Sequence, residues 1–173
     1  MTKKLSMKAV RANVKQKNET VTLEFHDGEY AIVIRPFFNP DDIEQVIQDF
    51  AEGMRAAKEH EANINDRHFW HFVHYHIIKV FTDLTTPKVS EKNPTADIQF
   101  FKALIKSDYY EAIMEVMQED ELVKVYDKVF DFLATHERLQ EQYEKTREDV
   151  QSIPFQSEAL RKRAQDNKQI PEV

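Results

Sequence analysis

The 173-residue sequence contains no cysteine and only two glycines, Gly28 and Gly53. The absence of cysteine excludes a disulfide framework, a zinc site built on thiolates and a thiol nucleophile, and it suits a reducing cytoplasm. The scarcity of glycine disfavours a turn-rich β architecture and leaves no glycine-rich loop to bind phosphate. The composition therefore predicts a mainly helical protein of a reducing cytoplasm rather than a secreted one.

Long apolar runs are also missing from the chain. No stretch reaches the roughly 18 apolar residues that a membrane span needs, and the basic N-terminus leads into polar sequence rather than into a signal-peptide core. We expect neither export nor a membrane partner. Hydrophobic residues nevertheless make up 41% of the chain and include 12 phenylalanines, enough to build one folded core.

The net charge of −7 is distributed unevenly along the chain. Residues 1–18 hold six Lys/Arg and no acid, whereas residues 19–135 hold 11 basic and 23 acidic side chains, a net −12. An acidic core repels phosphate backbones, so nucleic acid is not an expected partner. We divide the chain into a basic N-terminal arm (1–18), a β-hairpin plus helical domain (19–135), and a polar helical extension with a flexible tail (136–173).

An alternation of apolar residues predicts a β-hairpin with one apolar face. Apolar side chains occupy every second position on both sides of an Asp27-Gly28 turn, namely Val21, Leu23, Phe25, Tyr30, Ile32 and Ile34. An isolated hairpin is marginal in water, so this face should pack on the helices that follow. The proline of Arg35-Pro36 ends the second strand because it has no N–H for the ladder.

Apolar positions at three- and four-residue steps predict about five helices after the hairpin. Asn39-Pro40-Asp41-Asp42 starts a helix that runs to about residue 61, and Asn65-Asp66 starts a central helix that runs through Thr82. Six side chains of that helix are expected at the centre of the bundle: Phe69, Phe72, Val73, Ile77, Val80 and Phe81.

After a loop over residues 85–95, two short helices and one long helix complete the predicted bundle. The short helices carry Ile98, Phe101, Leu104 and Ile105, and then Ile113, Met114 and Met117. The long helix starts near Asp120 and carries Leu122, Tyr126, Val129, Phe130 and Leu133 on one face. From Ser152 onward we expect disorder. The predicted fold class is therefore mainly α, a bundle of about five helices preceded by an N-terminal β-hairpin, with polar flexible ends.

Four histidines crowd the predicted central helix, at His68, His71, His74 and His76. Residues three apart share a helix face, so His68, His71 and His74 could present imidazoles to a metal ion. A pair, His68 with His71 or His71 with His74, supplies only two ligands, whereas a metal site needs a third and usually a fourth, and the Glu-x-x-His context of helical metal sites is missing. A helical metalloprotein is thus the alternative hypothesis, and histidines that fill the margin of the core with their polar atoms satisfied are the simpler interpretation.

No catalytic signature appears elsewhere. Gly-x-Ser-x-Gly, Walker and kinase motifs are missing, and acidic clusters such as Asp41-Asp42 coincide with helix starts, where the helix dipole explains them. We predict a non-enzymatic protein without a cofactor or metal. It would act by binding other proteins.

Aromatic residues supply the candidates for such binding. In the pairs Phe37-Phe38 and Tyr109-Tyr110, two neighbours on a helix cannot both face inward, so one of each pair is available for an interface. Trp70 is a further candidate, and Ile153 and Phe155 flank Pro154 in a peptide suited to docking. The predicted partner-binding residues are Phe37, Trp70, Tyr109, Tyr110, Ile153 and Phe155.

Three stretches of the chain carry a resemblance to a known family. They are Ile34-Arg35-Pro36-Phe37-Phe38-Asn39, His74-Tyr75-His76-Ile77-Ile78-Lys79-Val80-Phe81-Thr82-Asp83-Leu84 and Glu121-Leu122-Val123-Lys124-Val125-Tyr126. In order and apolar pattern, residues 20–135 resemble the tail assembly chaperones of long-tailed, siphovirus-type phages and prophages of Gram-positive bacteria. The resemblance implies a non-enzymatic protein of the host cytoplasm that coats the tape measure protein and helps to bring in the major tail protein. A homo-oligomer is a further expected state.

Overall fold

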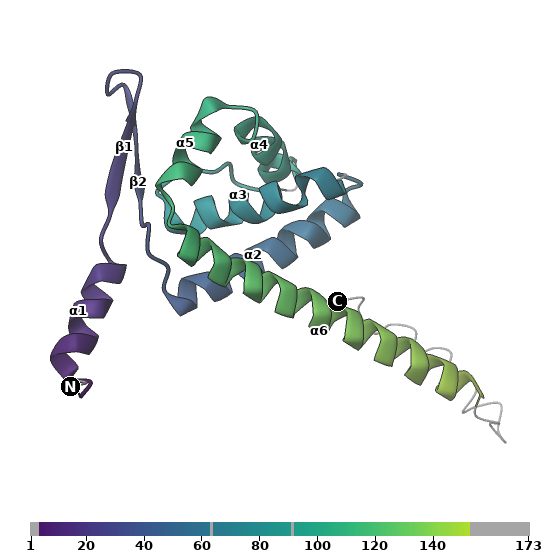
Figure 1. Ribbon diagram of the computed structural model, residues 1–173. Coiled ribbons are helices and arrows are strands. Elements are labelled where there is room, and N and C mark those ends of the chain that lie inside the picture. The colour runs from purple at the N-terminus through teal and green to yellow at the C-terminus, as the bar shows by residue number, and fades with distance from the viewer. Residues whose placement is uncertain (1–3, 63, 91, 153–173) are drawn as a thin grey trace. The chain divides into compact units, whose positions relative to one another are not determined.

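The computed structural model describes residues 4–62, 64–90 and 92–152. By its internal contacts the chain divides into two compact units, Met1–Val129 and Phe130–Val173. The elements in chain order are α1 (Met7–Lys17), β1 (Val21–Phe25), β2 (Tyr30–Ile34), α2 (Pro40–Glu59), the 3₁₀ turn η1 (Asp66–His68), α3 (Phe69–Phe81), α4 (Ala96–Leu104), α5 (Asp108–Val116) and α6 (Glu119–Ser152) (Figure 1). The predicted fold class, mainly α with an N-terminal hairpin, is confirmed.

The predicted hairpin is present. β1 and β2 pair antiparallel, with Val21 opposite Ile34 and Phe25 opposite Tyr30. The connecting loop contains His26, Asp27 and Gly28 in succession, all with positive φ angles. Glycine adopts this left-handed conformation without a steric penalty, and His and Asp are among the other residues that tolerate it best. The local sequence therefore determines where the chain reverses.

The apolar face of the hairpin is buried more deeply on β2 than on β1. Ile32 and Ile34 of β2 are buried, whereas Val21 is 42% exposed and Tyr30 at the far end is 55% exposed. The backbone of β2 continues into contact with the end of α3, since the Asp83 N–H donates to the Val33 carbonyl. The hairpin is thus attached mainly through β2.

α2 begins at the predicted cap. The Asn39 side chain accepts a hydrogen bond from the Asp42 N–H, and Pro40 is the first helical residue. α2 packs closely on α3, and the approach is tightest at Gly53. A Cβ placed there would lie 2.7 Å from Cζ of Phe72, so glycine at this position allows the two helices to touch.

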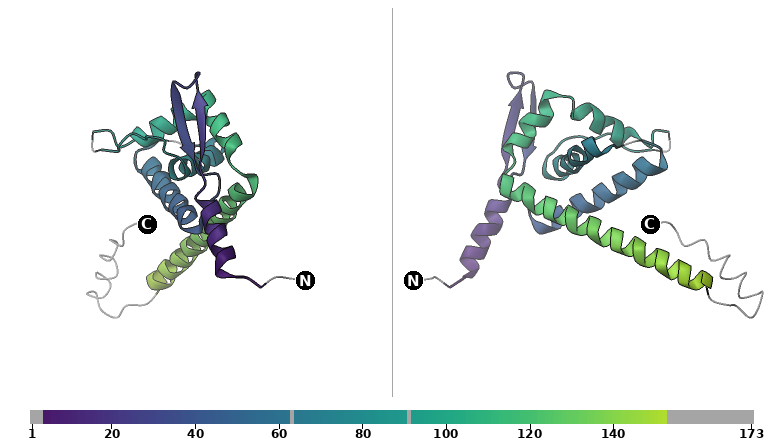
Figure 2. Two further views of the ribbon diagram at one scale, coloured as in Figure 1. Left: turned by 90° about the vertical axis from the view of Figure 1, so that its left-hand side faces the viewer. Right: turned by 45° about the vertical axis from the view of Figure 1, so that its right-hand side comes forward.

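α3 lies at the centre of the bundle, with α2, α4 and α5 around it (Figure 2). Seven of its thirteen residues are buried: Phe72, Val73, Tyr75, His76, Ile77, Ile78 and Phe81. The prediction of a central helix is confirmed for four of the six side chains that it named. It was wrong for Phe69 and Val80, which are partly exposed, and it did not include Tyr75 or His76.

The later helices occur in the predicted order, but the prediction of which α6 side chains face the core was wrong for one residue. Ile98, Phe101 and Leu104 of α4 and Ile113 of α5 are buried. On α6 the predicted apolar face included Phe130, which is 56% exposed, while the buried residues of its first turns are Glu121, Val125 and Val129. The buried positions recur every four residues, so the inward face of α6 is rotated away from Phe130.

The N-terminal segment is not the flexible arm that the sequence suggested. Residues 7–17 form α1, which is capped by Ser6 through a hydrogen bond from the Ala9 N–H. No residue of α1 is buried. Its apolar side chains Met7, Val10 and Val14 are exposed.

Candidate functional site

A closed network of histidines and tyrosines joins α3, α5 and α6. The hydroxyl of Tyr110 lies 2.8 Å from Nδ1 of His71 and 2.6 Å from Nδ1 of His74. Nε2 of His74 is 2.6 Å from the hydroxyl of Tyr126. Since a phenol has one proton to donate and can also accept, Tyr110 donates to one imidazole and accepts from the other. Both ring nitrogens of His74 are therefore hydrogen-bonded.

The electrostatics of this network keep His74, Tyr110 and Tyr126 uncharged near neutral pH. Burial, and secondarily the neighbouring His71, lowers the pKa of His74 to about 4. Burial first, and then Tyr126 and Glu111, raises the pKa of Tyr110 well above its usual range, and burial raises the pKa of Tyr126. Neutral imidazole and neutral phenols are the forms that hydrogen-bond in this pattern.

His76 lies deeper and has a different environment. It is 1% exposed, and within the part of the chain that the structure describes neither ring nitrogen has a hydrogen-bond partner. Its ring packs edge-on against Phe50 and Phe72. Burial, and then the charge of Lys79, lowers the pKa of His76 to about 3, although Asp97 acts in the opposite direction. His76 is thus a neutral core residue, and the expectation of a satisfied histidine at the core margin was wrong for it.

A second polar contact links α3 to α4. The Tyr75 hydroxyl donates to Oδ1 of Asp97, and Nζ of Lys79 donates to Oδ2 of the same carboxylate over 3.0 Å. Burial, the hydrogen bond to Asp97 and its negative charge raise the pKa of Tyr75. Both oxygens of the Asp97 carboxylate therefore bind side chains of α3.

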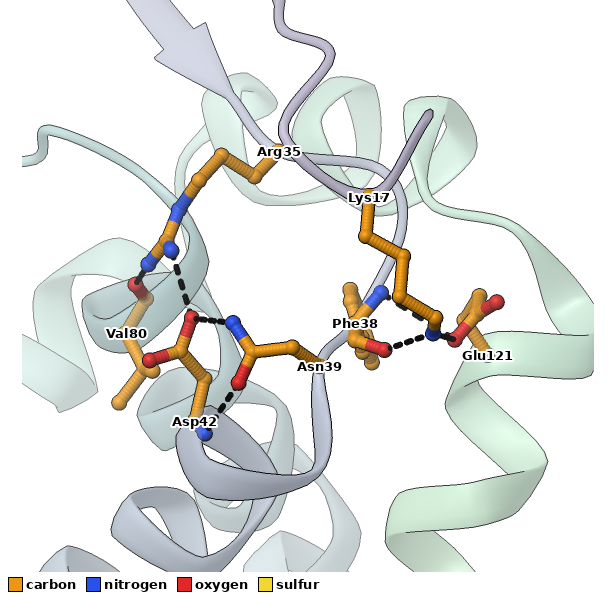
Figure 3. A network of polar contacts seen from close by, with 7 residues as sticks. All are labelled: Lys17, Arg35, Phe38, Asn39, Asp42, Val80 and Glu121. Carbon is orange, nitrogen blue, oxygen red and sulfur yellow. Dashed lines mark hydrogen bonds and ion pairs between the residues drawn. The ribbon is translucent and has the colours of Figure 1, made fainter. Parts of the chain in front are cut away.

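Two adjacent polar networks hold the segment that connects β2 to α2 (Figure 3). In the first, Arg35 donates to Oδ2 of Asp42 and to the Val80 carbonyl, and Asn39 donates to the same Asp42 oxygen over 2.6 Å. The guanidinium of Arg35 also lies 5.4 Å from the centre of the Phe81 ring. One arginine thereby connects the end of β2 to α2 and α3.

The second network centres on Glu121, which is only 9% exposed (Figure 3). Its Oε2 accepts a hydrogen bond of 3.2 Å from the Phe38 N–H and lies 2.7 Å from Nζ of Lys124. Lys17 donates to the Phe38 carbonyl, with its Nζ 4.0 Å from the Glu121 carboxylate. Glu121 was assigned only to the helix dipole from the sequence, but it also holds the chain before α2 from 83 residues away.

The predicted contact residues have different degrees of exposure. Both aromatic pairs divide as expected, since Phe37 and Tyr109 are partly exposed while Phe38 and Tyr110 are buried. Trp70 is partly exposed, with its ring edge-on to Phe69 and Tyr126 at centroid distances of 5.3 and 5.1 Å. Ile153 and Phe155 lie outside the described residues. The exposed part of this set is therefore Phe37, Trp70 and Tyr109.

Tyr109 also connects the tip of the hairpin to α5. Its ring lies edge-on to Phe25 with centroids 4.8 Å apart, and its hydroxyl is 2.8 Å from Nε2 of His26. Sequence reasoning missed this contact because the partners are 83 residues apart. Tyr30, next to the same tip, remains mostly exposed.

The sequence model of the YomO family matches residues 7–170 of the chain. This protein belongs to the YomO family. The family is phage-associated, which agrees with the phage origin that the resemblance implied. Comparison with curated proteins and with solved structures gave no match.

In this YomO family member, the arrangement of the histidines does not support the metalloprotein alternative. His71 and His74 direct Nδ1 to a shared tyrosine, and His68 instead lies edge-on to Phe101. Over residues 4–62, 64–90 and 92–152, no three histidine or acidic residues are placed to hold one metal ion. In the same part of this YomO chain, no helix is both long and apolar enough to cross a membrane.

Proposed function

We propose that the chain is a non-enzymatic phage tail assembly chaperone. In this proposal it binds and solubilises the tape measure protein in the host cytoplasm and assists assembly of the tail tube from the major tail protein. The observation that carries the proposal is the match to a phage-associated family over residues 7–170, together with the resemblance of residues 20–135 to such chaperones.

The state of the polar residues supports a binding role rather than a chemical one. Several histidines and carboxylates of the bundle hold the fold together, since His74 is hydrogen-bonded to two tyrosines and Asp97 to two side chains of α3. General acid–base catalysis would need a titratable group that can reach a substrate. The partly exposed Phe37 and Tyr109 instead provide aromatic surface of the kind that protein interfaces favour.

Co-expression with the tape measure protein of the same phage tests the proposal. The tape measure protein, a very long helical protein, should be insoluble alone and should appear in the soluble fraction, bound to the chaperone, when the two are made together. If it stays in the pellet in the presence of the wild-type chain, the proposed function is wrong.

Single substitutions of partly exposed aromatic residues test which side chains contact the tape measure protein. Phe37→Ser and Tyr109→Ser should each reduce the soluble tape measure protein about threefold or more, as expected for aromatic interface residues. Val89→Ser is the matched control, because Val89 is 59% exposed in the loop before α4. Thermal melts of each variant separate loss of binding from loss of folding. Equal rescue by all three variants would exclude Phe37 and Tyr109 from the contact surface.

We further expect that ending the chain after Gln151 leaves the melting temperature nearly unchanged. Within the described residues the buried apolar side chains end at Val129, so the removed segment begins far along the sequence from the last of them. The predicted docking peptide at Ile153 and Phe155 belongs to that segment, and it should matter for partner binding only. A large drop in melting temperature would show that the segment is needed for stability. Undiminished rescue of the tape measure protein would show that it is not needed for partner binding.

A further inference from the structure

α1 carries an apolar stripe that the described residues of its own chain leave exposed. Met7, Val10 and Val14 follow one another at three- and four-residue steps, so they share one helix face. They are 67%, 42% and 53% exposed. An amphipathic helix with its apolar face in water lacks the packing that usually stabilises a helix in a protein.

A basic stripe runs directly beside the apolar one. Lys8, Arg11 and Lys15 each follow an apolar stripe residue by one position, which places them about 100° around the helix. The helix contains no acidic residue. A partner for this surface must therefore combine apolar contact with negative charge.

The hairpin of this chain combines apolar surface with negative charge. Between Lys17 and Arg35 there is no basic residue, and four exposed acids lie on or beside the strands, namely Glu19, Glu24, Asp27 and Glu29. The register places Thr22, Glu24, Ala31 and Val33 on the face opposite to the buried Ile32 and Ile34, and all four are exposed. This outer face combines small or apolar side chains with the acid Glu24.

The two elements also match in length. An 11-residue helix is about 16 Å long, and a five-residue strand spans about 17 Å. A helix lying along the hairpin would cover its outer face and supply the second layer that a two-stranded sheet needs.

We propose that α1 of one copy docks on the outer hairpin face of a second copy, and that the second copy reciprocates. Docking within one chain is disfavoured, because only residues 18–20 separate α1 from β1 while Lys17 is held by the Phe38 carbonyl. Pairing of α1 with another α1 would place two basic stripes together. The reciprocal exchange is a two-fold, isologous contact that joins opposite charges twice.

Charge reversal on each side tests the contact by sedimentation or light scattering over roughly 1–200 µM chain, the range in which micromolar association is measurable. The helix variant is Lys8→Glu with Arg11→Glu, and the hairpin variant is Glu24→Lys with Glu29→Lys. All four residues are exposed, so both variants should fold, as circular dichroism can verify. Wild type should dimerise, and each variant alone should dimerise about tenfold or more weakly, because like charges then meet in both contacts.

Mixing the two variants is the decisive step. In the mixed dimer the acidic helix of one chain meets the basic hairpin of the other, and the remaining contact keeps its native charges, so association should return to near the wild-type strength. A wild-type chain that stays monomeric, or a mixture no stronger than the separate variants, overturns the proposal. Binding of monomeric wild type to vesicles containing phosphatidylserine would instead make α1 a membrane-surface helix. Self-association needs no tape measure protein, so this test is independent of the proposed function.

Discussion

Replacing Phe72 with alanine is expected to lower the free energy of unfolding by about 3–5 kcal/mol, the usual cost of deleting a buried aromatic ring. Phe72 is 0% exposed. Its ring contacts those of Phe101 and His76 at centroid distances of 5.0 and 4.6 Å, and it rests against Gly53 of α2. The deletion would open a cavity where α2, α3 and α4 meet, and such a loss is a large part of the stability of an ordinary domain.

Chemical denaturation of the full chain measures this effect, and the same substitution at Phe130 is the matched control. Phe130 is 56% exposed on α6, so Phe130→Ala should cost less than about 1 kcal/mol. A Phe72→Ala protein that unfolds within 1 kcal/mol of the wild type, a margin below the cost of an aromatic cavity, would show that the central position assigned to α3 is wrong.

Local signals explain why much of the fold could be predicted. The start of α2 depends on Asn39, Pro40 and Asp42, which contact one another within four residues. The hairpin depends on alternation and on a loop whose residues accept positive φ angles. The division of the Phe37-Phe38 and Tyr109-Tyr110 pairs into one exposed and one buried ring is likewise a consequence of neighbouring positions, which point in different directions.

The parts that could not be predicted depend on contacts between distant residues. Tyr110 meets His71 across 39 residues, and Glu121 meets the Phe38 N–H across 83. One sequence does not reveal such pairs, because many tyrosines and acids are equivalent until the helices are packed. The rotation of α6 that buries Val125 and exposes Phe130 has the same origin.

α1 shows a further limit of sequence reasoning. Its residues were assigned to a basic N-terminal arm because six Lys/Arg and no acid occur in residues 1–18. The stripe of Met7, Val10 and Val14 was present in the sequence at helical spacing, but its significance depends on the exposure of these side chains in the folded chain. Docking surfaces of this kind become visible only when the core is known.

Lowering the pH from 7 to 5 is expected to destabilise the protein by about 4 kcal/mol through His74 and His76, about 2 kcal/mol for each. The pKa of a histidine is about 6.5 in the unfolded chain, whereas the folded chain lowers it to about 4 for His74 and about 3 for His76. Between those values the unfolded state binds more protons than the folded state. Stability is therefore complete above pH 6.5 and declines as the pH falls.

The variant His76→Leu isolates the contribution of the buried His76 imidazole to the pH dependence of stability. Leucine cannot take up a proton, so the loss of stability between pH 7 and 5 should shrink to about half, roughly 2 kcal/mol, measured by urea denaturation at each pH. At pH 7 the variant should be at least as stable as the wild type, because both ring nitrogens of His76 lack a hydrogen-bond partner within the described residues. His60→Gln, at an exposed position just after α2, is the control and should keep the wild-type pH dependence. If His76→Leu keeps it as well, the proton is taken up elsewhere, and His76 is not the neutral core residue that its packing against Phe50 and Phe72 indicates.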